Sequence, residues 1–299
     1  MGILKTLTEE YFGEIEREED LIDIHDLNVE IVSFTDNNGK FHKRGYKPKD
    51  KYTLEKLLKR LIGVRGDEGE FNDIDTSDIT SMESLFLFNT TFNGDITGWN
   101  VSKVTDMSGM FFYASSFNQP IGKWKFPNVI YMNSMFFGAS SFNQDISKWK
   151  FPKVTDMNSM FYGASSFNQP IGDWKFPNVT DMSSMFMEAT SFNQPIGDWE
   201  FPNVENMNSM FWDAPSFNQD ISKWKFPNVE NMSGMFSGAS SFNQPIGDWE
   251  FPNVTDMRNM FSNATSFNQD LSKWDLKGKK KTKIFYDCPI KKEYKPKMK

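Results

Sequence analysis

The chain has 299 residues, including 30 Phe, 9 Trp and 18 Met, which is enough apolar material for one large or two ordinary domains. Its single cysteine, Cys288, excludes a disulfide framework and a cysteine-rich metal site. The net charge of −7 conceals an asymmetry, because residues 1–36 carry 11 acidic and 2 basic side chains, whereas residues 275–299 carry 3 acidic side chains and 10 lysines. These oppositely charged ends could support self-association.

The first 50 residues predict an acidic N-terminal extension. No secretory signal is visible at their start, and no apolar run anywhere in the chain approaches the roughly 18 residues that a membrane span needs. An acidic segment with helical character leads to Val32–Phe41, which predicts a hairpin around Asn38-Gly39. The sequence alone leaves the localisation open.

Residues 51–70 predict a cap helix and a linker. Thr53 is a suitable N-cap residue, and apolar residues follow it at helical spacing up to Ile62. The triplet Arg65-Gly66-Asp67 then allows two interpretations. It is an RGD sequence, which is an integrin-binding signal, or it is a turn that connects the cap helix to the first coil.

A strict repeat occupies residues 71–275. Phe-Asn pairs recur every 25 residues from Phe92 to Phe267, and tryptophan follows seven residues later in all eight units. Met-x-x-Met-Phe recurs seven times, and a degenerate first unit begins at Phe71. Such a period predicts a solenoid, in which each coil buries its apolar side against its neighbours. Residues 276–299 then form a basic C-terminal cap or tail, with Cys288 in the position that alanine holds in the repeats.

The spacing within one unit predicts a leucine-rich-repeat-like coil. Ile171-x-x-Trp174-x-Phe176 has the rhythm of a short strand with Trp and Phe pointing inward, and stacked coils would join these strands in a parallel sheet. The apolar residues from Val179 to Ala189 have offsets typical of a short helical turn. The Asn after each Phe predicts an asparagine ladder between coils, with a column of ligand-binding amides as the alternative.

The units "SFNQDISKWKFPKVTDMNSMFYGA" and "SFNQPIGDWKFPNVTDMSSMF" resemble the repeats of the BspA-like leucine-rich-repeat surface proteins, and within them the palindromic amphipathic repeat (PARCEL) group. The resemblance covers about residues 71–275, and the lead-in "YKPKDKYTLEKLLKRLIG" also resembles members of that group. It implies a non-enzymatic binding or adhesion protein that is exposed at the cell surface or secreted.

The sequence predicts neither an enzyme nor a cofactor. The repeats contain no histidine and no cysteine, and no phosphate-binding or dinucleotide-binding glycine motif occurs. A calcium site at Asp73, Asp75 and Asp78 is an alternative, although that segment lacks the EF-hand glycine and distal Glu. We therefore expect no catalytic, cofactor-binding or metal-ligating residue.

Two columns vary between otherwise uniform coils and are the candidate ligand-binding surfaces. One is the charged face, formed by the residues that flank the tryptophans: Lys123, Lys125, Lys148, Lys150, Asp173, Lys175, Asp198 and Glu200. The other is the aromatic column after each Met-Phe, which includes Tyr162, Met187 and Trp212 and either lies exposed or tucks between coils. We expect a protein or glycan ligand at a microbial surface and no nucleic acid. The alternative is an intracellular scaffold or self-assembly module.

Overall fold

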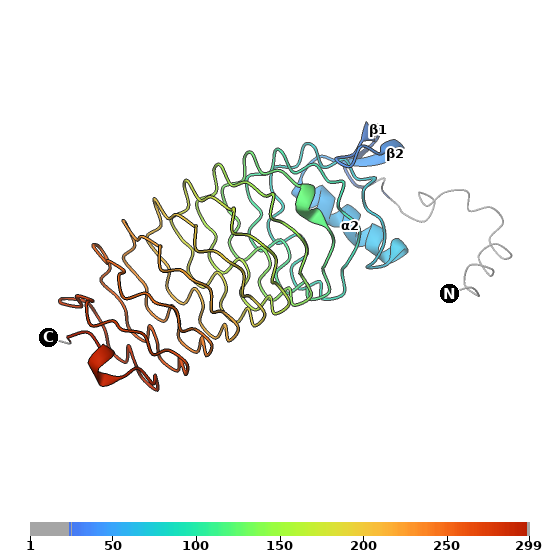
Figure 1. The fold of residues 1–299 in the computed structure, drawn as a ribbon. Coiled ribbons are helices and arrows are strands. Elements are labelled where there is room, and N and C mark those ends of the chain that lie inside the picture. The colour runs from blue at the N-terminus through green and yellow to red at the C-terminus, as the bar shows by residue number, and fades with distance from the viewer. Residues whose placement is uncertain (1–23, 25, 298–299) are drawn as a thin grey trace, which may run out of the picture.

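The computed structural model describes residues 24 and 26–297, which form an elongated stack of coils with a hairpin and a helix at its N-terminal end (Figure 1). The predicted acidic helix falls largely on residues outside this range. Strands β1 (Val29–Thr35) and β2 (Phe41–Pro48) pair antiparallel, as expected for a hairpin around Asn38-Gly39. Tyr46 of β2 forms a parallel bridge to Ile74, which joins the hairpin to the first coil.

Helix α2 (Lys51–Arg65) buries its leucines toward the solenoid core. The predicted N-cap, Thr53, is wrong. Asp50 caps the helix instead, because its Oδ1 accepts the Thr53 backbone N–H at 2.8 Å. The helix ends at Gly66, whose φ of 78° is a conformation that glycine adopts without a Cβ penalty.

The solenoid core confirms the prediction that Trp and Phe point inward. All eight repeat tryptophans, Trp99 to Trp274, are at most 4% exposed. Neighbouring coils stack like on like, with 6.5 Å between the ring centroids of Trp149 and Trp174 and 5.6 Å between those of Phe136 and Phe161. One coil contributes nine buried side chains: Phe142, Ile146, Trp149, Phe151, Val154, Met157, Met160, Phe161 and Ala164.

The predicted strand at Ile-x-x-Trp-x-Phe is wrong. Trp174 N–H donates to Ile171 O at 3.1 Å within its own coil, and among the described repeats this segment forms no backbone ladder. Coils are joined here by side chains, since Trp174 Nε1 donates to Ile146 O of the preceding coil at 3.2 Å. Trp rings stacked at about 6.5 Å are spaced more widely than the ~4.8 Å between paired strands.

The predicted helical turn is also wrong, because the Met-Phe segment consists of consecutive tight turns. Ser134 (φ 56°) and Gly138 (φ 66°) are left-handed, so a left-handed residue recurs every fourth position. Every second backbone N–H group donates to a carbonyl of the next coil, as Phe136 N–H does to Met160 O at 2.9 Å. The N–H groups between them donate to the carbonyl three residues earlier in the same coil, as Phe137 N–H does to Ser134 O. The described coils contain isolated parallel bridges and one 3-10 helix, η2 (Ile121–Lys123), and the C-terminal segment contains η3 (Lys292–Tyr294).

The asparagine ladder is confirmed. Asn118 N–H donates to Asn93 Oδ1 at 2.9 Å, and the following glutamine, Gln119, donates Nε2 to Asn93 O at 2.7 Å. The Asn backbone-to-amide bond repeats in every following coil and ends at Lys291, whose N–H donates to Asn268 Oδ1 at 3.0 Å. The amides therefore satisfy backbone donors that the tight return would otherwise leave unpaired.

Ring spacing differs between the columns of the stack. The outer rings of Phe137 and Tyr162 lie 4.2 Å apart, those of Phe136 and Phe161 lie 5.6 Å apart, and the rings of Trp149 and Trp174 lie 6.5 Å apart.

Candidate functional site

The charged face is exposed, as predicted. Its side chains alternate with buried tryptophans, so Lys123 and Lys125 point outward on either side of Trp124. Lys223 Nζ lies 3.3 Å from Asp198 Oδ1, and Lys273 Nζ lies 2.8 Å from Asp248 Oδ1, each across one coil. Part of the charge variation is therefore matching between neighbouring coils.

Four lysines of the charged face form a basic block: Lys123, Lys125, Lys148 and Lys150. Within the described residues, none of them lies in an ion pair, and Lys123 Nζ has only the amide oxygen of Asn38 at 3.4 Å. The Ser147 backbone N–H, the Ser147 hydroxyl and then the charge of Lys148 lower the pKa of Asp145, beside this block. The basic block is therefore an exposed cluster of positive charges without ion-pair partners among the described residues.

A hollow of about 650 Å³ indents the charged face beside this block. Its lining brings together four of the predicted residues: Lys148, Asp173, Lys175 and Asp198. Glycines and prolines, such as Gly172 and Pro195, also line it. A Cβ at Gly172 would lie 2.5 Å from Pro195 O, so the glycine allows adjacent coils to approach closely here.

The aromatic column tucks partly between the coils. Phe112 stacks on Phe137 at 4.4 Å, and Phe137 stacks on Tyr162 at 4.2 Å. Met187 and Trp212 are also half-buried, and the Trp212 ring fills the space beside Gly234, where a Cβ would come within 2.7 Å of it. The rings of Phe112, Phe137 and Tyr162 cover one another's faces, and the most exposed rings beside this column lie toward the two ends of the stack, at Phe88 (62%) and Tyr286 (52%).

Tyr162 offers a direct test of the column's geometry. Burial, followed by the Glu188 carboxylate that accepts its hydroxyl at 2.8 Å, raises the pKa of Tyr162 to about 12. We expect this phenol to ionise about two pH units later than an ordinary tyrosine, as measured by NMR titration of ring-labelled protein. Glu188→Gln should move the pKa back toward its usual value. A Tyr162 that ionises near pH 10 in both proteins would contradict this packing.

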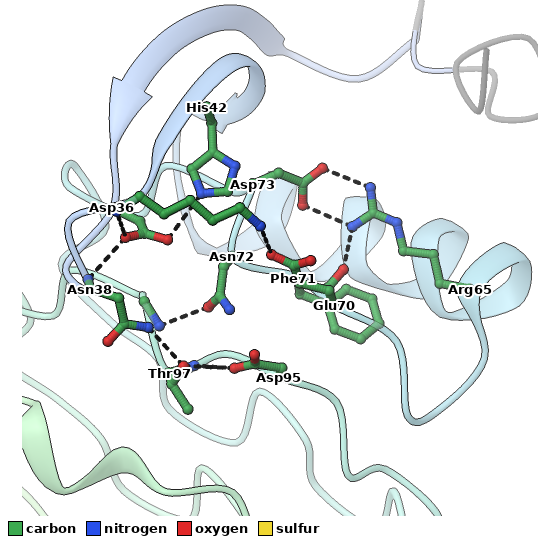
Figure 2. Close-up of polar contacts among 12 residues, drawn as sticks. Asp36, Asn38, His42, Arg65, Glu70, Phe71, Asn72, Asp73, Asp95 and Thr97 are labelled. Carbon is green, nitrogen blue, oxygen red and sulfur yellow. Dashed lines mark hydrogen bonds and ion pairs between the residues drawn. The ribbon is translucent and has the colours of Figure 1, made fainter. Parts of the chain in front are cut away.

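The RGD triplet is part of the N-terminal cap. Arg65 forms a two-pronged contact to Asp73, at 2.7 and 2.8 Å, and donates to Glu70 O at 2.6 Å (Figure 2). Its side chain is only 13% exposed. The turn interpretation therefore describes this segment, and Arg65 is held by Asp73 instead of projecting into solvent.

The same cap holds the three aspartates of the calcium alternative. Asp73 pairs with Arg65, and Lys47 lies 3.3 Å from Asp75 and 2.9 Å from Asp78. Lys103 also pairs with Asp78, and these two lysines lower the pKa of Asp78 to about 2. Among the described residues, no group of three or more potential ligands could hold a metal ion. Cys288 is half-buried, and burial raises the pKa of its thiol.

A long groove of about 920 Å³ was missed by the sequence interpretation. It runs past the Pro-Asn corners of several coils and is lined by Asn178, Asn203, Thr180, Glu205 and neighbouring equivalents. The asparagines donate Nδ2 to the preceding coil's proline carbonyl, at 2.7 Å for Asn178. The repeated Pro-Asn dipeptide is the sequence feature that could have indicated this groove. Its spacing does not show whether the asparagine side-chain nitrogen or oxygen faces outward.

Together, the coil stack and its surfaces define a repeat solenoid. The chain belongs to the family described as "Mycoplasma protein of unknown function, DUF285", whose model matches residues 59–164, 127–214, 145–239 and 202–295. This match supports the tandem-repeat part of the resemblance but does not extend to the BspA-like leucine-rich-repeat proteins specifically. No curated protein matches the chain. No helix in the described ranges is long and apolar enough to span a membrane.

Proposed function

We propose that this protein is a non-enzymatic binding solenoid that uses its charged face to bind a protein or glycan at a microbial surface. The observation that carries the proposal is the basic block, whose four lysines lack ion-pair partners among the described residues. Farther along the same face, Lys223 and Lys273 are each paired with an aspartate of the preceding coil. Unneutralised, exposed charge favours a partner of opposite charge.

Three further features support this assignment. The hollow lined by Lys148, Asp173, Lys175 and Asp198 adjoins the block and adds concave surface. The core repeats almost without change while the face varies, which is typical of a scaffold that displays a recognition surface. The aromatic column is a weaker candidate because its rings are stacked on one another.

The test begins with glycan and protein arrays probed with the full chain, followed by binding assays on each hit. Lys125→Glu combined with Lys150→Glu should weaken binding about tenfold or more at low salt. This difference should shrink as salt rises, because exposed charges are screened within about 8–10 Å. Trp212→Ser is the matched control for the aromatic column and should leave affinity unchanged. Undiminished binding by the double mutant would refute the proposal, and loss in Trp212→Ser would move the site to the column.

A further inference from the structure

Two aromatic residues of the first coils have a backbone conformation that bulky residues rarely adopt. Each Met-Phe segment has a left-handed residue two positions after its phenylalanine, and in the first two coils this residue is Phe88 (φ 57°) and Tyr113 (φ 53°). A positive φ is unfavourable for a bulky side chain. The equivalent residues of the later coils are three glycines, two aspartates, an asparagine and a glutamate: Gly138, Gly163, Glu188, Asp213, Gly238, Asn263 and Asp287.

Burial does not explain the choice of Phe88 at this position. The Phe88 side chain is 62% exposed and that of Tyr113 is 43% exposed, whereas Phe86, two residues earlier, is 2% exposed. Residues held in such a conformation occur preferentially at ligand-binding sites, where the strain is retained for function. An exposed ring at a strained position therefore indicates a role at the surface.

The exposed rings form a fixed arrangement, the aromatic platform, which consists of Phe88, Phe112 and Tyr113. Phe88 stacks on Tyr113 with 5.8 Å between the ring centroids and 15° between the ring planes, and Phe112 meets both rings edge-on. The Tyr113 ring lies over Gly138, where a Cβ would come within 2.5 Å of Tyr113 Cδ1. Among the described residues, Phe88 has ring contacts with Phe112 and Tyr113 alone, so much of its ring remains available to a ligand.

The size and charge of the aromatic platform limit the ligand. An aromatic side chain has on the order of 200 Å² of surface, so Phe88 and Tyr113 at these exposures together offer on the order of 200 Å². A stable protein interface needs about 800 Å² from each partner. Residues 84–94 and 107–122, which contain the platform, include no charged side chain, so they offer no cation to the phosphates of a nucleic acid. The platform therefore suits a small neutral ligand.

A sugar ring has the matching chemistry. The faces of aromatic rings are electronegative and attract the positively polarised C–H groups on the face of a sugar ring. The hydroxyls around the sugar remain free to form hydrogen bonds. Asn89 and Thr90 directly follow Phe88, and the side-chain amide of Asn89 and the hydroxyl of Thr90 have no hydrogen-bond partner among the described residues.

We propose that the aromatic platform binds a short neutral oligosaccharide by stacking sugar rings on Phe88 and Tyr113. The strained backbone at these two residues holds the rings in place before the sugar arrives, which lowers the cost of ordering them on binding. This site is separate from the basic block and does not depend on the function proposed for the charged face.

The test uses cellotetraose as the probe and the full chain with isotopically labelled Phe and Tyr rings. Cellotetraose is a neutral β-linked glucose oligomer, and the faces of its rings consist of C–H groups. The NMR signals of Phe88 and Tyr113 should shift as the sugar is added, with a dissociation constant of about 1 mM or tighter. Sorbitol carries hydroxyls but has no ring, so it is the control ligand and should leave these signals in place.

Phe88→Gly removes the exposed ring and introduces the residue that three later coils have at this position. This variant should bind cellotetraose at least about tenfold more weakly. Because glycine adopts a positive φ without a Cβ penalty, its melting temperature should be no more than about 2 °C below that of the parent. Phe88→Tyr keeps an aromatic ring and should bind within about twofold of the parent.

Lys125→Glu combined with Lys150→Glu should leave cellotetraose binding unchanged, which separates the aromatic platform from the basic block. The proposal would be overturned by an absence of ring shifts at up to about 10 mM cellotetraose, by equal shifts with sorbitol, or by undiminished binding in Phe88→Gly. A larger fall in the melting temperature of Phe88→Gly would assign the ring to packing and would also overturn it. So would sedimentation that shows a dimer of the parent and a monomer of Phe88→Gly, because the platform would then serve self-association.

Discussion

Trp174→Ala is expected to lower the free energy of unfolding by about 3–5 kcal/mol, which is typical when a large buried aromatic is removed. Trp174 has no solvent exposure, stacks on Trp149 at 6.5 Å and donates Nε1 to Ile146 O. The truncation therefore creates a cavity and also leaves a backbone carbonyl without its donor. Urea unfolding followed by tryptophan fluorescence and circular dichroism measures the loss.

The control for this experiment lies one residue away. Lys175 is exposed and forms no ion pair among the described residues, so Lys175→Glu should change stability by well under about 1 kcal/mol. Comparable losses for the two variants would mean that the inward and outward sides of this segment are assigned the wrong way round.

Asn193→Ala is expected to destabilise the protein by about 1–3 kcal/mol, the range for leaving buried donors unsatisfied. Asn193 Oδ1 accepts both the Asn218 N–H at 3.0 Å and Gln219 Nε2 at 2.9 Å. Thermal and urea unfolding of the variant give the change in stability. Asn193→Asp keeps an acceptor oxygen at this position, so it should retain more of the stability than Asn193→Ala.

Asn203→Ala provides the matched comparison, because it makes the same substitution in a different column. Asn203 is exposed and donates a single Nδ2 bond to Pro177 O at 2.7 Å. Its loss should cost at most about 1 kcal/mol. If Asn203→Ala were as harmful as Asn193→Ala, the ladder after Phe would have no special role in joining the coils.

The sequence was informative where the repeat period is compatible with only one structure. The 25-residue repeat correctly predicted a solenoid, the burial of the tryptophans and the Asn ladder. The prediction was wrong where two kinds of local structure place apolar residues at the same spacing. Turns that repeat every four residues, with Ser134 and Gly138 left-handed, place Met132, Met135 and Phe136 on one side much as a helix of 3.6 residues per turn would.

The candidate surfaces were also predictable only in part. Exposure of Lys125 and Lys150 followed from their positions beside buried tryptophans. The hollow near Asp173 and the groove along Asn178 depend instead on how closely coils approach and on which amide atom is used internally. Residue types and spacing do not contain that information.

The uniform contact between coils has a consequence for how such a protein changes length. Because Asn168, Asn193 and Asn218 make the same bonds to their neighbours, removal of residues 169–193 would join two coils that already fit each other. Duplication of the same 25 residues would add one coil with every bond in place. Recombination between the near-identical units could therefore lengthen or shorten the molecule in whole-coil steps.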